Sequence, residues 1–303
     1  MSLDFKGQVA IVTGAGGGLG RQHALALAQR GAKVLVNDLG AAVNGSGGSV
    51  SAAQAVVNEI KALGGEALAN GASVTDYAAV QAMVQQAVDA WGRVDILVNN
   101  AGILRDKSFS KMEMDDFKLV IDVHLMGAAH CSKAVWPHML AQKYGRIVMT
   151  TSSSGLYGNF GQANYGAAKM ALVGLMQTLS IEGAKSDIRV NCLAPTAATR
   201  MTEGLMPQDV LEALQPEFVV PAMLVLACSD APNRTVLCAG AGTFEAAHIT
   251  LTQGVHIGSG PDAPERLLEH LAAVRARSGE TVPMSGSEQG TNEISKAKQA
   301  VGQ

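Results

Sequence analysis

The feature that most constrains the fold is a regular alternation of short apolar runs with longer segments of helical periodicity. Six runs, several rich in Val and Ile, are candidate strands: Val9–Thr13, Lys33–Asp38, Glu66–Asn70, Ile96–Asn99, Gly145–Thr151 and Arg189–Ala194. Runs with little polar alternation are typical of strands covered on both faces. Amphipathic stretches lie between them: Leu19–Gln29, Ser51–Leu63, Tyr77–Trp91 and Met114–Leu140. The pattern predicts βαβ units and an α/β fold with a Rossmann-type, doubly wound parallel sheet.

The chain of 303 residues is long enough for one large domain, which we expect to span residues 1–257. Residues 258–303 form a C-terminal extension in this interpretation, because prolines interrupt the chain at 261, 264 and 283. Leucines at 267, 268 and 271 and Val274 predict one amphipathic helix there. The polar residues 285–303 are expected to be extended, disordered or packed on a partner subunit.

Composition excludes several classes of protein. A net charge of -3 gives no basic face for nucleic acid. The scattered cysteines contain no CxxC pair, so we expect no metal site, no disulfide framework and buried free thiols in a reducing compartment. No apolar run approaches the roughly 18 residues of a membrane span, and residues 1–8 lack a signal-peptide apolar region. We therefore expect a cytoplasmic protein without a membrane span.

A glycine-rich loop, TGAGGGLG at residues 13–20, follows the first predicted strand and opens the first predicted helix. Gly14, Gly18 and Gly20 permit a tight turn and a close backbone approach, and Leu19 lies in the first helical turn. Free N–H groups and the positive end of the helix dipole then face a pyrophosphate. In this context the loop predicts a nucleotide site, although a flexible loop and a site for S-adenosylmethionine are alternatives. A P-loop is excluded, because no Gly-Lys-[Ser/Thr] follows.

Asp38 ends the second predicted strand, about twenty residues later. A carboxylate there accepts hydrogen bonds from the adenosine ribose and repels the 2′-phosphate of NADP. Residues 39–43 hold no Arg or Lys to bind that phosphate, so NAD is the expected cofactor. A Gly/Asn/Ser-rich insertion, Ala41–Ser49, follows and is predicted to be an exposed loop.

Tyr165 and Lys169 lie four residues apart in a predicted helix, which places both side chains on one helix face. A phenol is a poor base at neutral pH, and a nearby ammonium lowers its pKa. Tyr165 could then take a proton from an alcohol. The alternative is an ordinary surface pair, and Ser152 argues against it. Ser152 follows a strand at the carboxyl edge of the sheet, where it could donate to a substrate oxygen; the neighbouring Ser153 and Ser154 are alternatives for this role.

Asn99, Ala101 and Gly102 belong to the segment NNAG, which ends another strand at the same edge. The asparagine side chains can bond backbone groups there, and Gly102 would let a cofactor approach. A simple turn is the alternative interpretation.

These four elements occur in the order and spacing of the short-chain dehydrogenase/reductase superfamily, which the chain resembles over roughly residues 4–240. More narrowly, VNDLG, NNAGILRDKSFSKM, YGRIVMTTSSSGLYGNFGQANYGAAK and NCLAPTAATRMT look like the (3R)-hydroxyacyl-CoA dehydrogenase units of peroxisomal multifunctional enzymes type 2, also called 17β-hydroxysteroid dehydrogenases type 4. The resemblance implies a Rossmann-type sheet, NAD, and oxidation of a 3-hydroxyacyl-CoA to the 3-oxo form. It also implies a homodimer or homotetramer.

The resemblance assigns further residues. His124 stands where the superfamily usually has a catalytic Asn, as in the narrower family; a buried, hydrogen-bonded histidine is the alternative. Ser73 and Val74 replace the usual Asp-Val at the adenine pocket, so we expect a backbone contact there. Pro195 and Thr199 are expected at the cofactor, although the usual Pro-Gly reads Pro195-Thr196.

Substrate contacts are expected from the loop between Ser152 and Tyr165, at Tyr157, Phe160 and Gln162. The expected substrate is a fatty or steroid side-chain acyl-CoA thioester. A hydroxysteroid or other secondary alcohol is one alternative, and a non-catalytic NAD(H)-sensing protein is another from a different class. The intact Ser–Tyr–Lys set argues against a sensor, which needs only the nucleotide loop.

Overall fold

The computed structural model describes residues 3–42, 44–47, 49–198 and 208–301. The chain divides into two compact units, residues 1–246 and 247–303. This division falls earlier than the boundary predicted at residue 258, because the last strand of the sheet continues the first unit to that point.

The first unit is built on one sheet with the strand order β3-β2-β1-β4-β5-β6-β7-β8, which confirms the Rossmann-type fold. The pairings recorded along the sheet from β3 to β7 are all parallel. The strands are β1 (Val9–Thr13), β2 (Lys33–Asn37), β3 (Ala67–Asn70), β4 (Ile96–Asn99), β5 (Gly145–Thr150), β6 (Ile188–Thr196), β7 (Val236–Gly240) and β8 (Thr243–Ala247). The order reverses between β1 and β4, and ligands of open α/β sheets bind outside the carboxyl ends of strands at such a switch point.

The strands β7 and β8 were not predicted from the sequence. β7 adds to β6 in parallel, from the pair Cys192–Val236 to the pair Thr196–Gly240. β8 follows after Ala241 and Gly242, which have φ of 49° and 73°. Positive φ at both central residues is the conformation of a two-residue hairpin turn. β8, with the sequence TFEAA, is mostly exposed and lacks a continuous apolar run, whereas β7, with the sequence VLCAG, is apolar but was not singled out.

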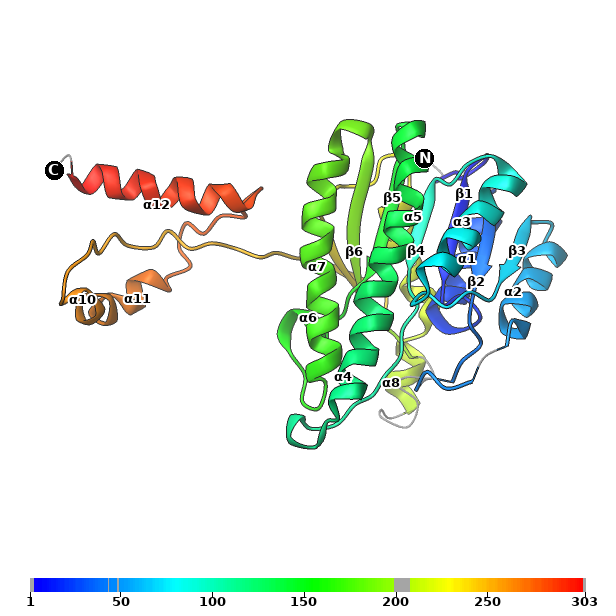
Figure 1. The fold of residues 1–303 in the computed structure, drawn as a ribbon, viewed down its shortest axis with the longest axis horizontal. Coiled ribbons are helices and arrows are strands. Elements are labelled where there is room, and N and C mark those ends of the chain that lie inside the picture. Colours follow the sequence, from blue (N-terminus) through cyan, green and yellow to red (C-terminus); the bar gives the residue numbers. More distant parts are fainter. Residues whose placement is uncertain (1–2, 43, 48, 199–207, 302–303) are drawn as a thin grey trace. The chain divides into compact units, whose positions relative to one another are not determined.

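Helices cover both faces of the sheet. On one face α1 (Gly18–Gln29) contacts α2 (Ser51–Ala62) and α9 (Val220–Ala227), and on the other α5 (Gly127–Gln142) contacts α3 (Tyr77–Trp91) and α7 (Ala163–Gly183). Figure 1 shows α5 and α7 crossing in front of β4, β5 and β6. A large apolar core lies between the strands and the layer of α1, α2 and α9, and it includes Val12, Val34, Val98, Leu27 and Met223.

The long helix predicted over Met114–Leu140 is interrupted. The structure has α4 (Met114–Ile121), a π-helical turn η2 (Asp122–Met126) and then α5. π-turns inside α-helices are rare and frequently lie at functional sites. This turn contains His124. The spacing of apolar residues in the sequence did not predict this turn, because helical spacing continues on both sides of it.

Shorter elements complete the first unit: η1 (Phe109–Lys111), α6 (Ser153–Tyr157), η3 (Ala184–Ser186), α8 (Gln208–Ala213) and η4 (Pro216–Phe218). Among the described residues, one segment, Val210–Ala227, is long and apolar enough to cross a membrane by length and composition. The structure divides the segment among α8, η4 and α9, and α9 packs into the core through Met223 and Leu226.

The second unit contains α10 (Ala263–Glu269), α11 (Leu271–Val274) and α12 (Gly286–Val301). The one amphipathic helix predicted here is two short helices, because His270 leaves helical geometry between them with φ -94° and ψ 4°. The polar stretch expected to be extended forms α12. Its Glu, Gln, Lys and Ala residues are good helix formers, which outweigh the glycines at 286 and 290.

Candidate active site

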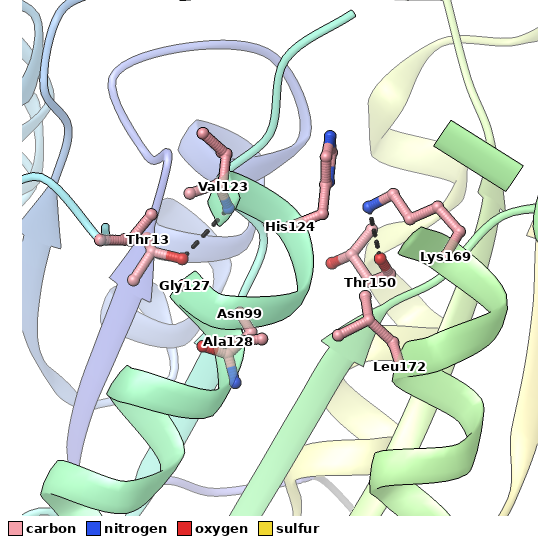
Figure 2. Close-up of a pocket in the computed structure, with 11 residues that line it drawn as sticks. Thr13, Asn99, Val123, His124, Gly127, Ala128, Thr150, Lys169 and Leu172 are labelled. Carbon is pink, nitrogen blue, oxygen red and sulfur yellow. Dashed lines mark hydrogen bonds between the residues drawn. The ribbon is translucent and has the colours of Figure 1, made fainter. Parts of the chain in front are cut away.

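The candidate site lies where β1, β4 and β5 end side by side. Thr13, Asn99 and Thr150 are the last residues of these strands, and all three line one cavity of about 10 Å3, room for about one water. Figure 2 shows Lys169 reaching toward Thr150 on one side of the cavity and His124 across from it. The cavity is therefore bordered by side chains from strand ends, from the π-turn and from α7.

The glycine-rich loop is held against the segment NNAG. A Cβ added to Gly14, which has φ of 63°, would lie 2.7 Å from the Cα of Ala101. Asn100 donates from Nδ2 to the carbonyl oxygens of Thr13 and Gly14, both at 3.0 Å. A Cβ on Gly20 would lie 2.5 Å from this amide nitrogen and still closer to the Gly14 carbonyl oxygen. Glycine is thus required at both positions by close backbone approach.

The start of α1 suits an anion. Its N-cap residue, Gly17, supplies no side-chain hydrogen bond, so the first-turn N–H groups lack a side-chain acceptor. Such groups bind phosphate readily, with help from the helix dipole. Leu19 packs against the core beneath and holds this turn in place.

Asp38 follows β2 beside this loop. Its carboxylate accepts the Gly16 N–H at 2.7 Å and the Gly40 N–H at 2.6 Å. The side chain is only half-buried, and each carboxylate oxygen keeps a second lone pair. Asp38 is therefore fixed next to the candidate phosphate site with acceptor capacity remaining, as a contact to ribose hydroxyls requires.

Ser152 lies close enough to Tyr165 to affect the pKa of its phenol. Burial raises the pKa of the Tyr165 phenol above 10.0, while the Ser152 hydrogen bond lowers it and the Asp106 carboxylate raises it. The expected lowering of the Tyr165 pKa by Lys169 is not found. The Lys169 nitrogen lies 5.4 Å from the centroid of the tyrosine ring, and the effect of burial is larger. Ser152 also caps α6 by accepting the Ser154 N–H at 3.2 Å, which fixes the serine side chain.

Lys169 is buried and donates to the Thr150 carbonyl oxygen at 2.6 Å. The Thr151 hydroxyl donates to the Lys169 carbonyl oxygen at 2.7 Å, so both ends of the residue are bound to the chain after β5. Burial lowers the pKa of the lysine to about 7. The amine is therefore partly neutral at neutral pH, which weakens its effect on Tyr165.

His124 is buried in the π-turn, and its ring meets the Tyr165 ring edge-on with centroids 5.2 Å apart. Its Nε2 lies 3.1 Å from the Ile103 nitrogen and 2.8 Å from the Ile103 oxygen. Burial, with a smaller contribution from Lys169, holds the pKa of the imidazole well below 6.5. A Cβ on Gly102 would collide with this ring, so that glycine is needed for His124 as much as for any ligand.

Only some of the remaining predicted cofactor residues line the cavity. Val74, Asn99 and Ala101 line the cavity, and the Asn99 Oδ1 is buried without a partner in the described structure. Ser73 lies next to Val74, where its hydroxyl bonds Thr75 at 2.8 Å. Pro195 lies near the end of β6. Thr199 falls outside the described residues.

The predicted substrate residues separate into two groups. Tyr157 and Phe160 are 74% and 90% exposed, so neither lines a closed pocket in this structure. Gln162 instead accepts the Ser154 hydroxyl at 2.8 Å and donates to Asp106 at 2.6 Å. These bonds place it at the start of α7, three residues before Tyr165.

Sequence reasoning missed residues that hold the site together. The Thr13 hydroxyl accepts the N–H groups of Asn100 and Ala101 at 3.0 and 3.1 Å. Asn164 is fully buried and bonds Arg105 and Tyr165. The available signals were a Thr that ends a strand before a glycine loop and an Asn directly before the predicted tyrosine, but the bonding partners are distant in sequence.

The residues present fit a nicotinamide dinucleotide. The glycine loop leaves uncapped N–H groups at the start of α1, Asp38 has free acceptor capacity, and Asn99, which lines the cavity, has an Oδ1 without a partner among the described residues. Metal chemistry has no comparable support: the described residues contain no group of three or more His, Cys, Asp or Glu that could hold an ion. The four cysteines are free; Cys131, Cys192 and Cys228 are buried and Cys238 is half-buried.

Comparison with known proteins agrees with this geometry. The family model described as short chain dehydrogenase matches residues 8–209. Peroxisomal multifunctional enzyme A of Dictyostelium discoideum is 48% identical over 95% of this chain and 64% of its own length. The full-length peroxisomal multifunctional enzyme type 2 of Drosophila melanogaster superposes with a TM-score of 0.80 at 38% identity, over 98% of this chain and 50% of that one. The chain thus spans about half to two thirds of these relatives.

A further similar structure contains ligands. It is a 7α-hydroxysteroid dehydrogenase complexed with NADH and 7-oxoglycochenodeoxycholic acid, with a TM-score of 0.71 and 30% identity over 79% of this chain and 95% of that one.

Proposed function

This chain belongs to the short-chain dehydrogenase family and is an oxidoreductase acting on CH–OH groups, and from that premise we propose that it oxidises (3R)-3-hydroxyacyl-CoA thioesters to 3-oxoacyl-CoA with NAD. The observation that carries the proposal is the grouping of Tyr165 with Lys169, whose nitrogen lies 5.4 Å from the tyrosine ring centroid, and with Ser152, which is fixed at the end of β5. A protein that only sensed NAD(H) would need the nucleotide loop and not this triad.

The proton chemistry follows from the positions of these three residues. Ser152 accepts a backbone N–H that fixes its hydroxyl, and a substrate oxygen bound beside Tyr165 would receive the hydroxyl hydrogen. Tyr165, after losing its phenol proton to solvent, then receives the alcohol proton as a phenolate. A bound nicotinamide would supply the hydride acceptor for the alcohol carbon. Lys169 would bind the nicotinamide ribose, and a ribose oxygen beside its ammonium would favour the charged form whose pKa burial lowers.

NAD is favoured over NADP by Asp38. The carboxylate is fixed by Gly16 and Gly40, so it cannot easily turn away from a 2′-phosphate, and it would repel that group. The 7α-hydroxysteroid dehydrogenase complex with NADH supports a nicotinamide cofactor in this fold.

A 3-hydroxyacyl-CoA is supported by the narrower likeness to peroxisomal multifunctional enzymes. The second candidate is a hydroxysteroid, which the 7α-hydroxysteroid dehydrogenase favours. A homodimer or homotetramer remains a prediction. A cytoplasmic location also stays a prediction, because the word peroxisomal in the relatives' names describes those proteins.

The test is a spectrophotometric assay of NADH formation over a matched panel. It contains (3R)- and (3S)-3-hydroxyacyl-CoA esters, a steroid side-chain thioester, the same acyl chains without CoA, and a free 17β-hydroxysteroid, each with NAD or NADP. We expect the largest kcat/KM for a (3R) thioester with NAD. A larger value for the free steroid would establish the second candidate. NADH binding without turnover on any member would indicate a sensing protein.

A further inference from the structure

We propose that Arg105 is a positioning residue that couples the insertion loop beside the dinucleotide site to the helix that carries Tyr165. The proposal rests on the proposed function only in taking the site of Asp38 and the glycine loop as the place where a dinucleotide binds. Three sets of contacts carry it: one at the base of the loop, one at its tip, and one at the start of α7.

The base of the insertion loop is joined directly to the candidate cofactor site. Asp38 accepts N–H groups from Gly16 in the phosphate loop and from Gly40 in the insertion. The Ser49 N–H donates to the Leu39 carbonyl oxygen at 2.8 Å, which closes the base of the loop. A ligand that binds at Asp38 and Gly16 therefore constrains Asp38, the residue whose carboxylate holds the start of the insertion loop.

The tip of the loop reaches the catalytic side. The Asn44 side chain accepts the Ser46 N–H at 3.0 Å and its hydroxyl at 2.7 Å, a local turn that fixes the Asn44 backbone. Arg105 donates from Nε to the Asn44 carbonyl oxygen at 2.7 Å. Gly45 faces the side chain of Ile103, the residue that bonds His124. The tip therefore rests on the segment 103–105.

The guanidinium of Arg105 joins this tip to α4. Its Nη1 donates to Asp116 at 2.8 Å, and Asp116 lies in the first turn of α4. The arginine side chain is 31% exposed and the aspartate is more buried, so this pair is less screened than an ordinary surface pair. Two different acceptors are held by one planar donor group, which a lysine cannot reproduce.

The backbone of the same residue is bound to α7. The carbonyl oxygen of Arg105 accepts from the Nδ2 of Asn164 at 3.0 Å, and the Oδ1 of Asn164 accepts the Tyr165 N–H at 2.7 Å. The Lys107 N–H donates to the Gly161 carbonyl oxygen at 2.9 Å. Because Asn164 is fully buried, its two bonds leave it little freedom. A shift of segment 105–107 would therefore move the backbone at Tyr165.

The consequence is a chain of contacts that starts at Asp38 and Gly40 and passes through the Ala42–Ser46 hydrogen bond and Asn44. It continues through Arg105 and Asn164 to Tyr165. Ordering of the insertion loop by a dinucleotide would then stabilise the start of α7, and reciprocally the placement of Tyr165 would strengthen dinucleotide binding. Removing the guanidinium should weaken the connection without touching the catalytic groups. Given the partial exposure of Arg105, we expect about a fivefold rise in KM for the dinucleotide and about a fivefold fall in kcat.

The decisive experiment is hydrogen–deuterium exchange of the full chain with and without dinucleotide. A binding titration with NADH and NADPH first identifies the tighter ligand, which serves as the probe. In the unaltered protein the probe should slow exchange in residues 39–50 and in residues 161–164, which precede the residues proposed to contact the nicotinamide. In Arg105→Met it should slow exchange in residues 39–50 only. Arg105→Lys, which keeps the charge and can hold only one of the two acceptors, should give the same loss and serves if Arg105→Met does not fold.

Arg189→Met is the matched control. Arg189 is 33% exposed, pairs with Asp187 at 3.0 Å and lies at the opposite end of the strands, so its loss should leave both protected segments unchanged. The proposal is overturned if the Arg105 variants keep protection in both segments, or if the unaltered protein shows it in one alone. Failure of the proposed function would show separately, as absent dinucleotide binding or absent turnover of hydroxyacyl-CoA.

Discussion

Lys169 donates to the carbonyl oxygen of Thr150 at 2.6 Å, so the residue one helical turn after Tyr165 is fixed to the end of the strand that precedes Ser152. This one bond sets the spacing between α7 and β5 at the site. It is formed by an amine whose pKa burial has lowered to about 7.

Replacing Lys169 with Met should therefore remove activity and change how stability depends on pH. The unfolded lysine has a pKa near 10.5, so between pH 10.5 and 7 the unfolded state binds the proton that the folded state does not. The cost to stability of burying Lys169 is therefore full below about pH 7 and disappears as the pH rises toward 10.5. Relative to Lys169→Met, the unaltered cofactor-free protein should gain about 2 kcal/mol in free energy of unfolding between pH 7 and 9. Urea unfolding at both pH values measures this, and an unchanged difference would contradict it.

Tyr165→Phe should separate chemistry from binding. The substitution removes the hydroxyl that Ser152 bonds and keeps the ring that packs against His124. We expect kcat to fall by at least about 100-fold, the usual contribution of a positioned proton acceptor. The dissociation constant of NADH, measured by fluorescence, should stay within about twofold. Turnover close to that of the unaltered enzyme would exclude Tyr165 as the proton acceptor.

Asp38 should determine cofactor preference. In Asp38→Asn the amide oxygen can still accept a backbone N–H while the charge that repels a 2′-phosphate is lost. We expect the ratio of kcat/KM for NAD over NADP to fall by about tenfold or more, since unit charges at close range interact by more than about 1 kcal/mol at a protein surface. Steady-state assays with both dinucleotides measure the ratio. A ratio that does not change would place discrimination elsewhere.

Gly20 and Gly174 form a pair of opposite predictions. A methyl group on Gly20 would meet the Gly14 carbonyl oxygen and the Asn100 amide, whereas nothing lies within 4 Å of a Cβ on Gly174 in α7. Gly20→Ala should lower the melting temperature and abolish NADH binding. Gly174→Ala should raise the free energy of unfolding by roughly 0.5–1 kcal/mol, since Ala is favoured over Gly in a helix. Calorimetry with and without NADH distinguishes the two effects.

His23 should make the protein sensitive to acid. It is fully buried in α1, neither ring nitrogen has a hydrogen-bond partner in the described structure, and burial lowers its pKa to about 4. Below pH 6.5 the unfolded state takes up a proton that the folded state refuses, so stability falls as the pH drops toward 4. Relative to His23→Leu, the unaltered protein should lose about 2 kcal/mol between pH 7 and 5. Equal losses in chemical denaturation would show that His23 has a partner in solution.

The parts of the fold that sequence could predict are those encoded locally. The strand before Gly14 and the four-residue spacing of Tyr165 and Lys169 each depend on neighbouring residues, and the structure has the expected elements there. The contacts of Asn164 and Arg105 join residues 59 apart in the chain. No periodicity or motif encodes such a pairing, because it depends on how two loops meet after the sheet has formed.

The electrostatic expectation failed for a related reason. The four-residue spacing places Lys169 next to Tyr165, and on that basis alone a lowered pKa of the tyrosine is expected. Burial of both groups is set by the surrounding fold, and it reverses the direction for Tyr165. Exposure of Tyr157 and Phe160 could likewise not be predicted from their place in a loop.

The π-turn at residues 122–126 has a consequence for how this helix tolerates length changes. An i→i+5 turn contains one residue more than an α-helical turn, so α4 and α5 follow apolar repeats that are out of phase with each other. Deleting a single residue there would let an uninterrupted α-helix form. The helices on either side would keep their faces, but the wider turn that holds the imidazole of His124 against Ile103 and the tyrosine ring would be lost. A deletion that makes the backbone more regular would thus remove the side of the site that His124 forms.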